Sequence, residues 1–141
     1  MSNIGNSNTR NGTLASGQTV ANSGYILKVA SGLLTVAGGS ASADADTPFA
    51  VSLDESSRDA AQALVAGGTV TYCPSGGVVW IRADAGTYNL GATVYLSDDS
   101  AGFCDATQAS GATALGVYVG DNAAVVVEGT LVPVNTNAST W

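Results

Sequence analysis

The sequence predicts an all-β protein, a small β-barrel or sandwich with one short helix and an extended N-terminal arm. Val, Ala, Thr and Gly dominate the composition, which includes 18 glycines and only 6% aromatic residues. Branched side chains suit pleated strands, and glycines suit the tight turns between them. Short apolar runs alternate with turn residues along the chain, a pattern typical of sandwiches and barrels. The 141 residues, of which 45% are hydrophobic, are enough for one domain with one core.

The chain divides into three segments by composition. Residues 1–18 consist almost wholly of Asn, Ser, Gly and Thr, so alone they bury too little apolar surface to offset the entropy of ordering. They are predicted to form a flexible arm, either a disordered tail or an arm that orders on a partner by adding a strand to a sheet edge. Residues 19–134 form the predicted β domain, and residues 135–141 form a polar C-terminal tail.

Short strands bounded by Gly, Pro, Asn, Asp and Ser account for most of the domain. We expect strands at 24–29, 33–36, 49–53, 69–72, 78–82, 88–90, 93–96, 114–119, 124–128 and 131–134, with a short edge segment at 102–104. Pro133 has no N–H to donate, so the last strand is expected at an edge or a barrel rim. Trp80 lies inside an apolar strand and is predicted to be part of the core.

One helix is predicted between Ser57 and Val65. Ser56-Ser57-Arg58-Asp59 provides a hydroxyl followed three residues later by a carboxylate, which is typical of a helix start. Ala60, Ala61, Leu64 and Val65 would form its apolar face, and Gly67-Gly68 would end it.

The charge of the chain disfavours nucleic acids and membranes as partners. Its 4 basic and 11 acidic residues give a net charge of −7. Basic side chains drive binding to phosphate backbones and to anionic lipid surfaces, and this chain has few of them. The residues after Met1 show neither the basic region nor the apolar run of a signal peptide, so we expect a product made in the cytoplasm.

The sequence contains no histidine, so it lacks the commonest general base and metal ligand. Asp98-Asp99 and Asp54-Glu55 are paired carboxylates in turn sequences, where aspartates bind their own backbone; calcium binding and catalysis are the alternatives. Asp44-Ala45-Asp46 resembles a fragment of a calcium loop that lacks the later ligands. The predictions are therefore no enzyme activity, no cofactor and no metal site.

Cys73 and Cys104 lie far apart and do not have the spacing of a metal site. They are interpreted as two buried thiols, as a disulfide formed in an oxidising medium, or as a reactive thiol, and the sequence leaves these alternatives open.

Three stretches of the chain resemble the small capsid decoration, or cement, proteins of tailed bacterial and archaeal viruses. They are 24–36 with 49–54, then 76–81 with 90–97 and 102–103, and finally 114–119 before a closing pair of strands. The resemblance is one of pattern and covers most of the chain, although the helix near Ser57 and the tail ending in Trp141 depart from it. It implies a β-barrel or sandwich, often trimeric, seated on the outer shell of a virion.

Two functions follow from the sequence. The first is a structural virion protein that binds the outer surface of a capsid and stabilises it, with the major capsid protein and two further copies of itself as partners. Its expected contact residues are Ile4, Arg10, Leu14 and Trp141. The alternative is a carbohydrate-binding or adhesin-like module of a tail fibre, with a sugar platform formed by Tyr72, Tyr88, Tyr95 and Tyr118.

Overall fold

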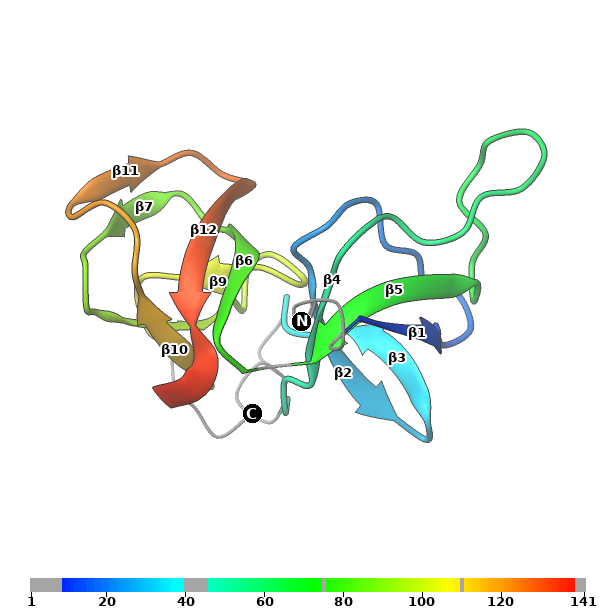
Figure 1. Ribbon diagram of the computed structural model, residues 1–141, viewed down its shortest axis with the longest axis horizontal. Helices are drawn as coiled ribbons and strands as arrows, with labels where there is room; N and C mark the ends of the chain where they lie inside the picture. Colours follow the sequence, from blue (N-terminus) through cyan, green and yellow to red (C-terminus); the bar gives the residue numbers. More distant parts are fainter. Residues whose placement is uncertain (1–8, 40–45, 75, 110, 139–141) are drawn as a thin grey trace, which may run out of the picture.

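The computed structural model is all-β, as the sequence predicts, and its strands form three sheets (Figure 1). It describes residues 9–39, 46–74, 76–109 and 111–138. The strands are β1 (Arg10–Thr13), β2 (Ile26–Ala30), β3 (Leu33–Val36), β4 (Ala50–Ser52), β5 (Thr69–Pro74), β6 (Val78–Ala83), β7 (Gly86–Tyr88), β8 (Thr93–Leu96), β9 (Cys104–Asp105), β10 (Ala114–Tyr118), β11 (Ala124–Val126) and β12 (Thr130–Asn135).

Five of the strands close into a barrel, in the order β10-β12-β6-β9-β8. Its pairs are antiparallel except for β6 and β9, which run parallel with Ala83 opposite Cys104. Alternate side chains point inward and form the larger hydrophobic core, which includes Ile81, Val94, Leu96, Leu115, Val132 and Val134. β9, expected at an edge, therefore lies within the barrel wall.

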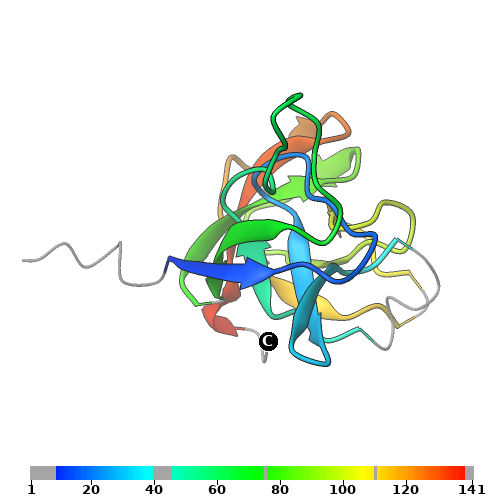
Figure 2. The ribbon, with the colours of Figure 1, turned by 90° about the vertical axis from the view of Figure 1, so that its right-hand side faces the viewer.

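The second sheet is open and has the order β1-β5-β4-β2-β3. It covers a smaller core of Leu14, Val20, Leu27, Leu34 and Val70. Ser31 and Gly32, with φ of 53° and 78°, form the two-residue turn that joins β2 to β3. Figure 2 views the molecule from the side of this sheet, with β1 lying across the front.

The two edges of the open sheet approach each other. Leu14 and Leu34 form a parallel bridge, and the amide of Ala15 donates to the carbonyl of Leu34 at 2.8 Å. Residues 10–14, which the sequence assigned to a flexible arm, thus contribute a strand and a buried leucine to the fold. Although the composition of residues 1–18 predicts too little apolar surface for ordering, the single residue Leu14 supplies enough to anchor this segment.

The barrel and the open sheet are joined directly at β6. The amide of Arg82 donates to the carbonyl of Gly24 at 2.8 Å, and its guanidinium donates to the carbonyls of Ser23 and Gly129. Gly24 has a φ of 88°, and a Cβ at this position would lie 2.4 Å from Cδ2 of Leu131. The junction therefore requires glycine at position 24.

The helix predicted between Ser57 and Val65 is wrong. Arg58 and Leu64 form an isolated antiparallel bridge, and the loop between them projects from the sheet (Figure 1). Oδ1 of Asp59 accepts from the amides of Ala61 and Ala63, and Gln62 has a left-handed φ of 67°. A helix this short needs a surface on which to bury its apolar face, and this loop has none.

The short 3₁₀ helix Thr136–Ala138 follows β12. Among the described residues, no helix has the length and apolar character needed to cross a bilayer. Pro133, expected at an edge or rim, lies in β12 between β6 and β10, where its carbonyl accepts from Val119 just beyond the end of β10. Pro133 therefore lies at the end of the pairing between β12 and β10, where the hydrogen bond that it cannot donate would extend the ladder by one residue.

Candidate protein-contact surface

Trp80 lies on the outside of the barrel, so its prediction as a core residue is wrong. Along β6, Val79 and Ile81 point into the barrel and are 7% and 0% exposed. Val78 and Trp80 point outward and are 54% and 57% exposed. The sequence held a signal for this outcome: Arg82, two residues after Trp80, lies on the same face of the strand, and arginine rarely points into an apolar core.

Apolar side chains surround Trp80. Pro133 of β12 is its cross-strand partner, and β11 with the residue after it presents Val125 and Val127, which are 83% and 73% exposed. We call this the Trp80 surface, and it consists of Val78, Trp80, Val125, Val127, Leu131 and Pro133.

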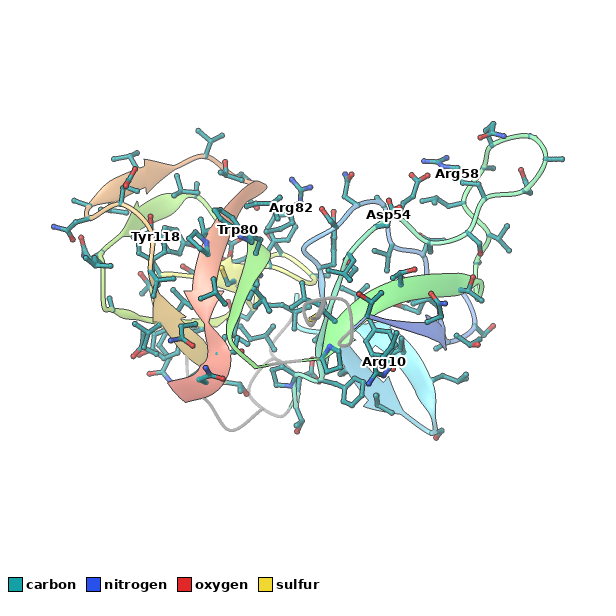
Figure 3. The ribbon with its side chains drawn as sticks, in the orientation of Figure 1. Arg10, Asp54, Arg58, Trp80, Arg82 and Tyr118 are labelled. Carbon is teal, nitrogen blue, oxygen red and sulfur yellow. The ribbon has the colours of Figure 1, made fainter. Side chains whose placement is uncertain are left out.

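The Trp80 side chain borders two hollows. One, of about 430 Å³, is lined by β11, β12, Tyr118 and Asp121. The other, of about 180 Å³, lies at the junction with the open sheet and is lined by Leu53, Cys73, Val78 and Leu131. Figure 3 shows Trp80 and Tyr118 on the barrel, with Arg82 beside the junction.

The chemistry of the Trp80 surface favours burial against another protein. Arg82 and Asp121 are the charged side chains beside it, and the Arg82 guanidinium is already held by backbone carbonyls. Exposed apolar patches with a polar rim mark interaction sites, and tryptophan is enriched among the residues that dominate binding. No nucleophile–base pair lines either hollow in the part of the chain that the structure describes.

Two of the contact residues predicted from sequence, Arg10 and Leu14, are described by the structure, and both belong to the open sheet and not to this surface. Arg10 is exposed on β1 of the open sheet, and its backbone is opposite Tyr72 (Figure 3). Leu14 is 2% exposed within the core of that sheet, which leaves little of its side chain for a partner. Ile4 and Trp141 lie outside the described residues.

Two carboxylate groups noted in the sequence have structural partners. Glu55 pairs with Arg58 at 2.7 Å, and this hydrogen bond lowers the pKa of the glutamate. Asp46 pairs with Lys28 at 2.7 Å and accepts from the amide of Gly38 at 2.8 Å. Asp44, which completed the apparent calcium-loop fragment, lies outside the described residues.

Both cysteines are free thiols. Cys104 lies in the barrel core, where burial raises its pKa to about 12, and burial also raises the pKa of the half-buried Cys73. Because the thiolate is the reactive form, these shifts disfavour the interpretation as a reactive cysteine.

The tyrosines do not form a common sugar platform. Tyr88 and Tyr118 are 1% and 3% exposed in the barrel core, with ring centroids 5.7 Å apart. Tyr72 packs against Phe49 on the open sheet. Of the four tyrosines, only Tyr72 on β5 of the open sheet and Tyr95 on β8 of the barrel are partly exposed, so they lie in different sheets and the sugar-binding alternative is weakened.

Comparison with known proteins identifies the fold. No protein-family model and no curated protein matches this sequence. A chain of the solved structure described as the capsid of Myoviridae phage XM1 superposes with a TM-score of 0.53 at 16% sequence identity. The match covers 92% of this chain and 83% of that chain. This protein therefore shares its fold, over almost its whole length, with a chain of a myovirus capsid structure.

Proposed function

We propose that this protein is a capsid decoration protein, which binds the outer surface of an assembled shell and stabilises it. The structural likeness to a chain of a myovirus capsid, across 92% of the present chain, is the observation that carries the proposal. The pattern of the sequence, which resembles decoration proteins of tailed viruses, supports it separately. The proposed partners are the major capsid protein and two further copies of this chain, and the proposed location is the virion.

The Trp80 surface is the proposed contact with the shell. Trp80, Val125 and Val127 are each more than half exposed, and burying apolar area contributes roughly 25 cal/mol per Å². The two hollows beside Trp80 can receive side chains of a partner. Aromatic residues that dominate binding lie in such well-packed regions near the centre of an interface.

The net charge of −7 fits this role, because like charges keep free copies apart before assembly. The Trp80 surface itself is largely uncharged, so docking there leaves most of the acidic side chains in water, with Asp121 beside the larger hollow as the exception. Ile4, Arg10 and Trp141 stay predicted as further contacts made by the two ends of the chain.

The test is binding of the purified protein to shells assembled without it, measured by co-sedimentation. Trp80→Ala should weaken binding by about 30-fold or more, the loss typical of a dominant interface residue. Phe49→Ala is the matched control, since Phe49 is also an aromatic and is 40% exposed, but on the open sheet. It should bind like the wild type.

Light scattering of the same samples separates two kinds of contact. Wild type and both variants should have three times the 13.9 kDa mass of one chain. A monomeric Trp80→Ala variant would assign the surface to contacts between copies, and a wild-type monomer would contradict the trimer. Wild-type protein that does not sediment with shells would contradict decoration itself.

A further inference from the structure

Three aspartates converge at one end of the barrel. Asp84 directly follows β6, Asp105 ends β9, and Asp99 lies in the turn between β8 and β9. One carboxylate oxygen from each lies within 4.8 Å of the others. The parallel pairing of β6 with β9 accounts for part of this arrangement, because it places the residues after Ala83 and Cys104 side by side.

Asp84 has a buried carboxylate oxygen without a partner. The residue is 7% exposed, and its backbone amide donates to the carbonyl of Cys104 at 2.8 Å. The hydroxyl of Ser97 donates to Oδ2, while Oδ1 is buried and has no hydrogen-bond partner among the described residues. A buried acceptor left unpaired costs about 1–3 kcal/mol, and more when it is charged.

Hydrogen bonds of the turn do not compensate for this oxygen. The amides of Asp99 and Ser100 both donate to the hydroxyl of Ser97 at 3.0 Å, so they are directed away from the carboxylates. Glu128 adds further negative charge at the rim, where it accepts from Ser100 and from the amide of Ala85. Burial raises the pKa of the Asp84 carboxyl above its ordinary value, although the hydrogen bond from Ser97 lowers it, and the charge of Glu128 makes a smaller contribution that raises it.

The basic side chains of the protein are engaged elsewhere. Lys28 pairs with Asp46, Arg58 pairs with Glu55, and Arg82 donates to backbone carbonyls at the junction. Arg10 lies on β1 of the open sheet (Figure 3). None of these basic side chains therefore pairs with the three converging carboxylates.

We propose that Asp84, Asp99 and Asp105 bind a calcium ion. Calcium prefers carboxylate oxygens at 2.3–2.6 Å, so ligands on opposite sides of the ion are about 4.6–5.2 Å apart. The separations within the cluster, all inside 4.8 Å, fit around such an ion. Oδ1 of Asp84 is the available buried ligand, and water completes the coordination on the exposed side of Asp99.

The ion would link the end of β6 to β9 and to the β8–β9 turn. In the barrel order, β6, β9 and β8 are neighbours. This site goes beyond capsid decoration and does not depend on it, because the ion binds to the free protein.

The experiment uses the full chain, freed of metal with a chelator and titrated with CaCl₂ by calorimetry. We expect a dissociation constant on the order of 10⁻⁴–10⁻³ M, the weak end of the range for calcium sites in proteins. A calcium concentration of about ten times that constant should raise the melting temperature by roughly 3–6 °C. MgCl₂ and NaCl at the same ionic strength should have a smaller effect.

Asp99→Asn removes one ligand without disturbing the core, because Asp99 is exposed. It should weaken calcium binding at least tenfold and abolish most of the thermal shift. Asp98→Asn is the matched control, since it removes the same charge from the adjacent residue, which is outside the cluster. It should bind calcium like the wild type.

Three results would overturn the proposal. The first is a thermal shift with CaCl₂ no larger than that with NaCl, and the second is an equal loss of binding in Asp98→Asn and Asp99→Asn. The third concerns Asp84→Asn: if this variant is more stable than the wild type, and calcium stabilises neither, then Asp84 is a protonated core residue. If Asp84→Asn does not fold, Asp105→Asn replaces it and must weaken binding as Asp99→Asn does.

Discussion

The closed barrel and the open sheet each contain five strands, but they complete their walls in different ways. In the barrel, every strand has a neighbour on both sides, so backbone hydrogen bonds run around the full circle. In the open sheet, β1 and β3 are edges that meet only where Leu14 bridges to Leu34. Five strands are therefore closed by a continuous ladder in one region, and in the other by a single backbone bridge at which the Leu14 side chain is buried.

Gly12 lies where β1 approaches β3, and we call this contact between the two edges the seam. A Cβ at position 12 would lie 2.5 Å from Cδ1 of Leu34, so a side chain there would require the Leu34 side chain to move. Unpaired edges are sites where another chain can add a strand, and covering them with a packed contact is one way to prevent it.

The largest effect is expected from opening this seam with Leu14→Ala. The substitution should lower the free energy of unfolding by about 2–4 kcal/mol, because a fully buried leucine leaves a cavity. Native-state hydrogen exchange should show faster exchange at Ala15, which donates to Leu34, than at Tyr118, which donates to Ala92 in the barrel.

Leu90→Ala is the control for this substitution, since Leu90 is 58% exposed and its loss should cost less than about 0.5 kcal/mol. Equal loss of protection in the barrel and the open sheet would show that the two regions unfold as one unit, and the comparison drawn above would fail.

An effect of similar or smaller size is expected from straining the junction between the two regions. Gly24→Ala should destabilise the protein by about 2–4 kcal/mol, since an alanine there has a left-handed φ and contacts Leu131 and Arg82 too closely. Gly91→Ala has a similar φ of 85° with open space around it, so it should cost only about 1–2 kcal/mol. Chemical denaturation measures both, and equal losses would remove the role assigned to close packing at Gly24.

The smallest effect is expected from the β2–β3 hairpin of the open sheet. Ser31 and Gly32 both have positive φ, the geometry of a type I′ turn, in which Asn-Gly is preferred. Ser31→Asn should therefore stabilise the protein by less than about 1 kcal/mol, whereas Ser31→Ala should destabilise it. Thermal unfolding of the two variants checks the sign, and a stabilising alanine would contradict the turn geometry.

Most strands after residue 19 could be predicted from the sequence because each depends on a few neighbouring residues, whereas β1 was assigned to the arm. The segments around Ile26, Val51 and Ile81 have the branched residues and flanking turn signals that define strands locally. The helix predicted near Ser57 was wrong because its apolar positions form a stable helix only when they pack against a surface, and the projecting loop has none. The prediction for Trp80 was wrong because an apolar strand can still have an exposed face, and the alternation along β6 places Trp80 on the same face as Arg82.

The aspartate cluster could not be predicted, since its members meet only through barrel closure. Asp84 and Asp105 are separated in sequence by more than twenty residues, and the parallel pairing that joins them has no local signature. In the sequence, Asp98 and Asp99 stand out as an adjacent pair. In the structure, Asp99 lies in the cluster with Asp84 and Asp105, and Asp98 lies outside it.

The position of β12 has a consequence for biosynthesis. β12 fills the gap between β6 and β10 and pairs with β6 along its whole length, from Thr130 to Asn135. A ribosome must therefore release residues up to Asn135 before the barrel can close, while the open sheet is complete once Pro74 has emerged. The nascent chain should accordingly fold in two stages. The N-terminal open sheet forms first, and the barrel closes after β12 has left the ribosome.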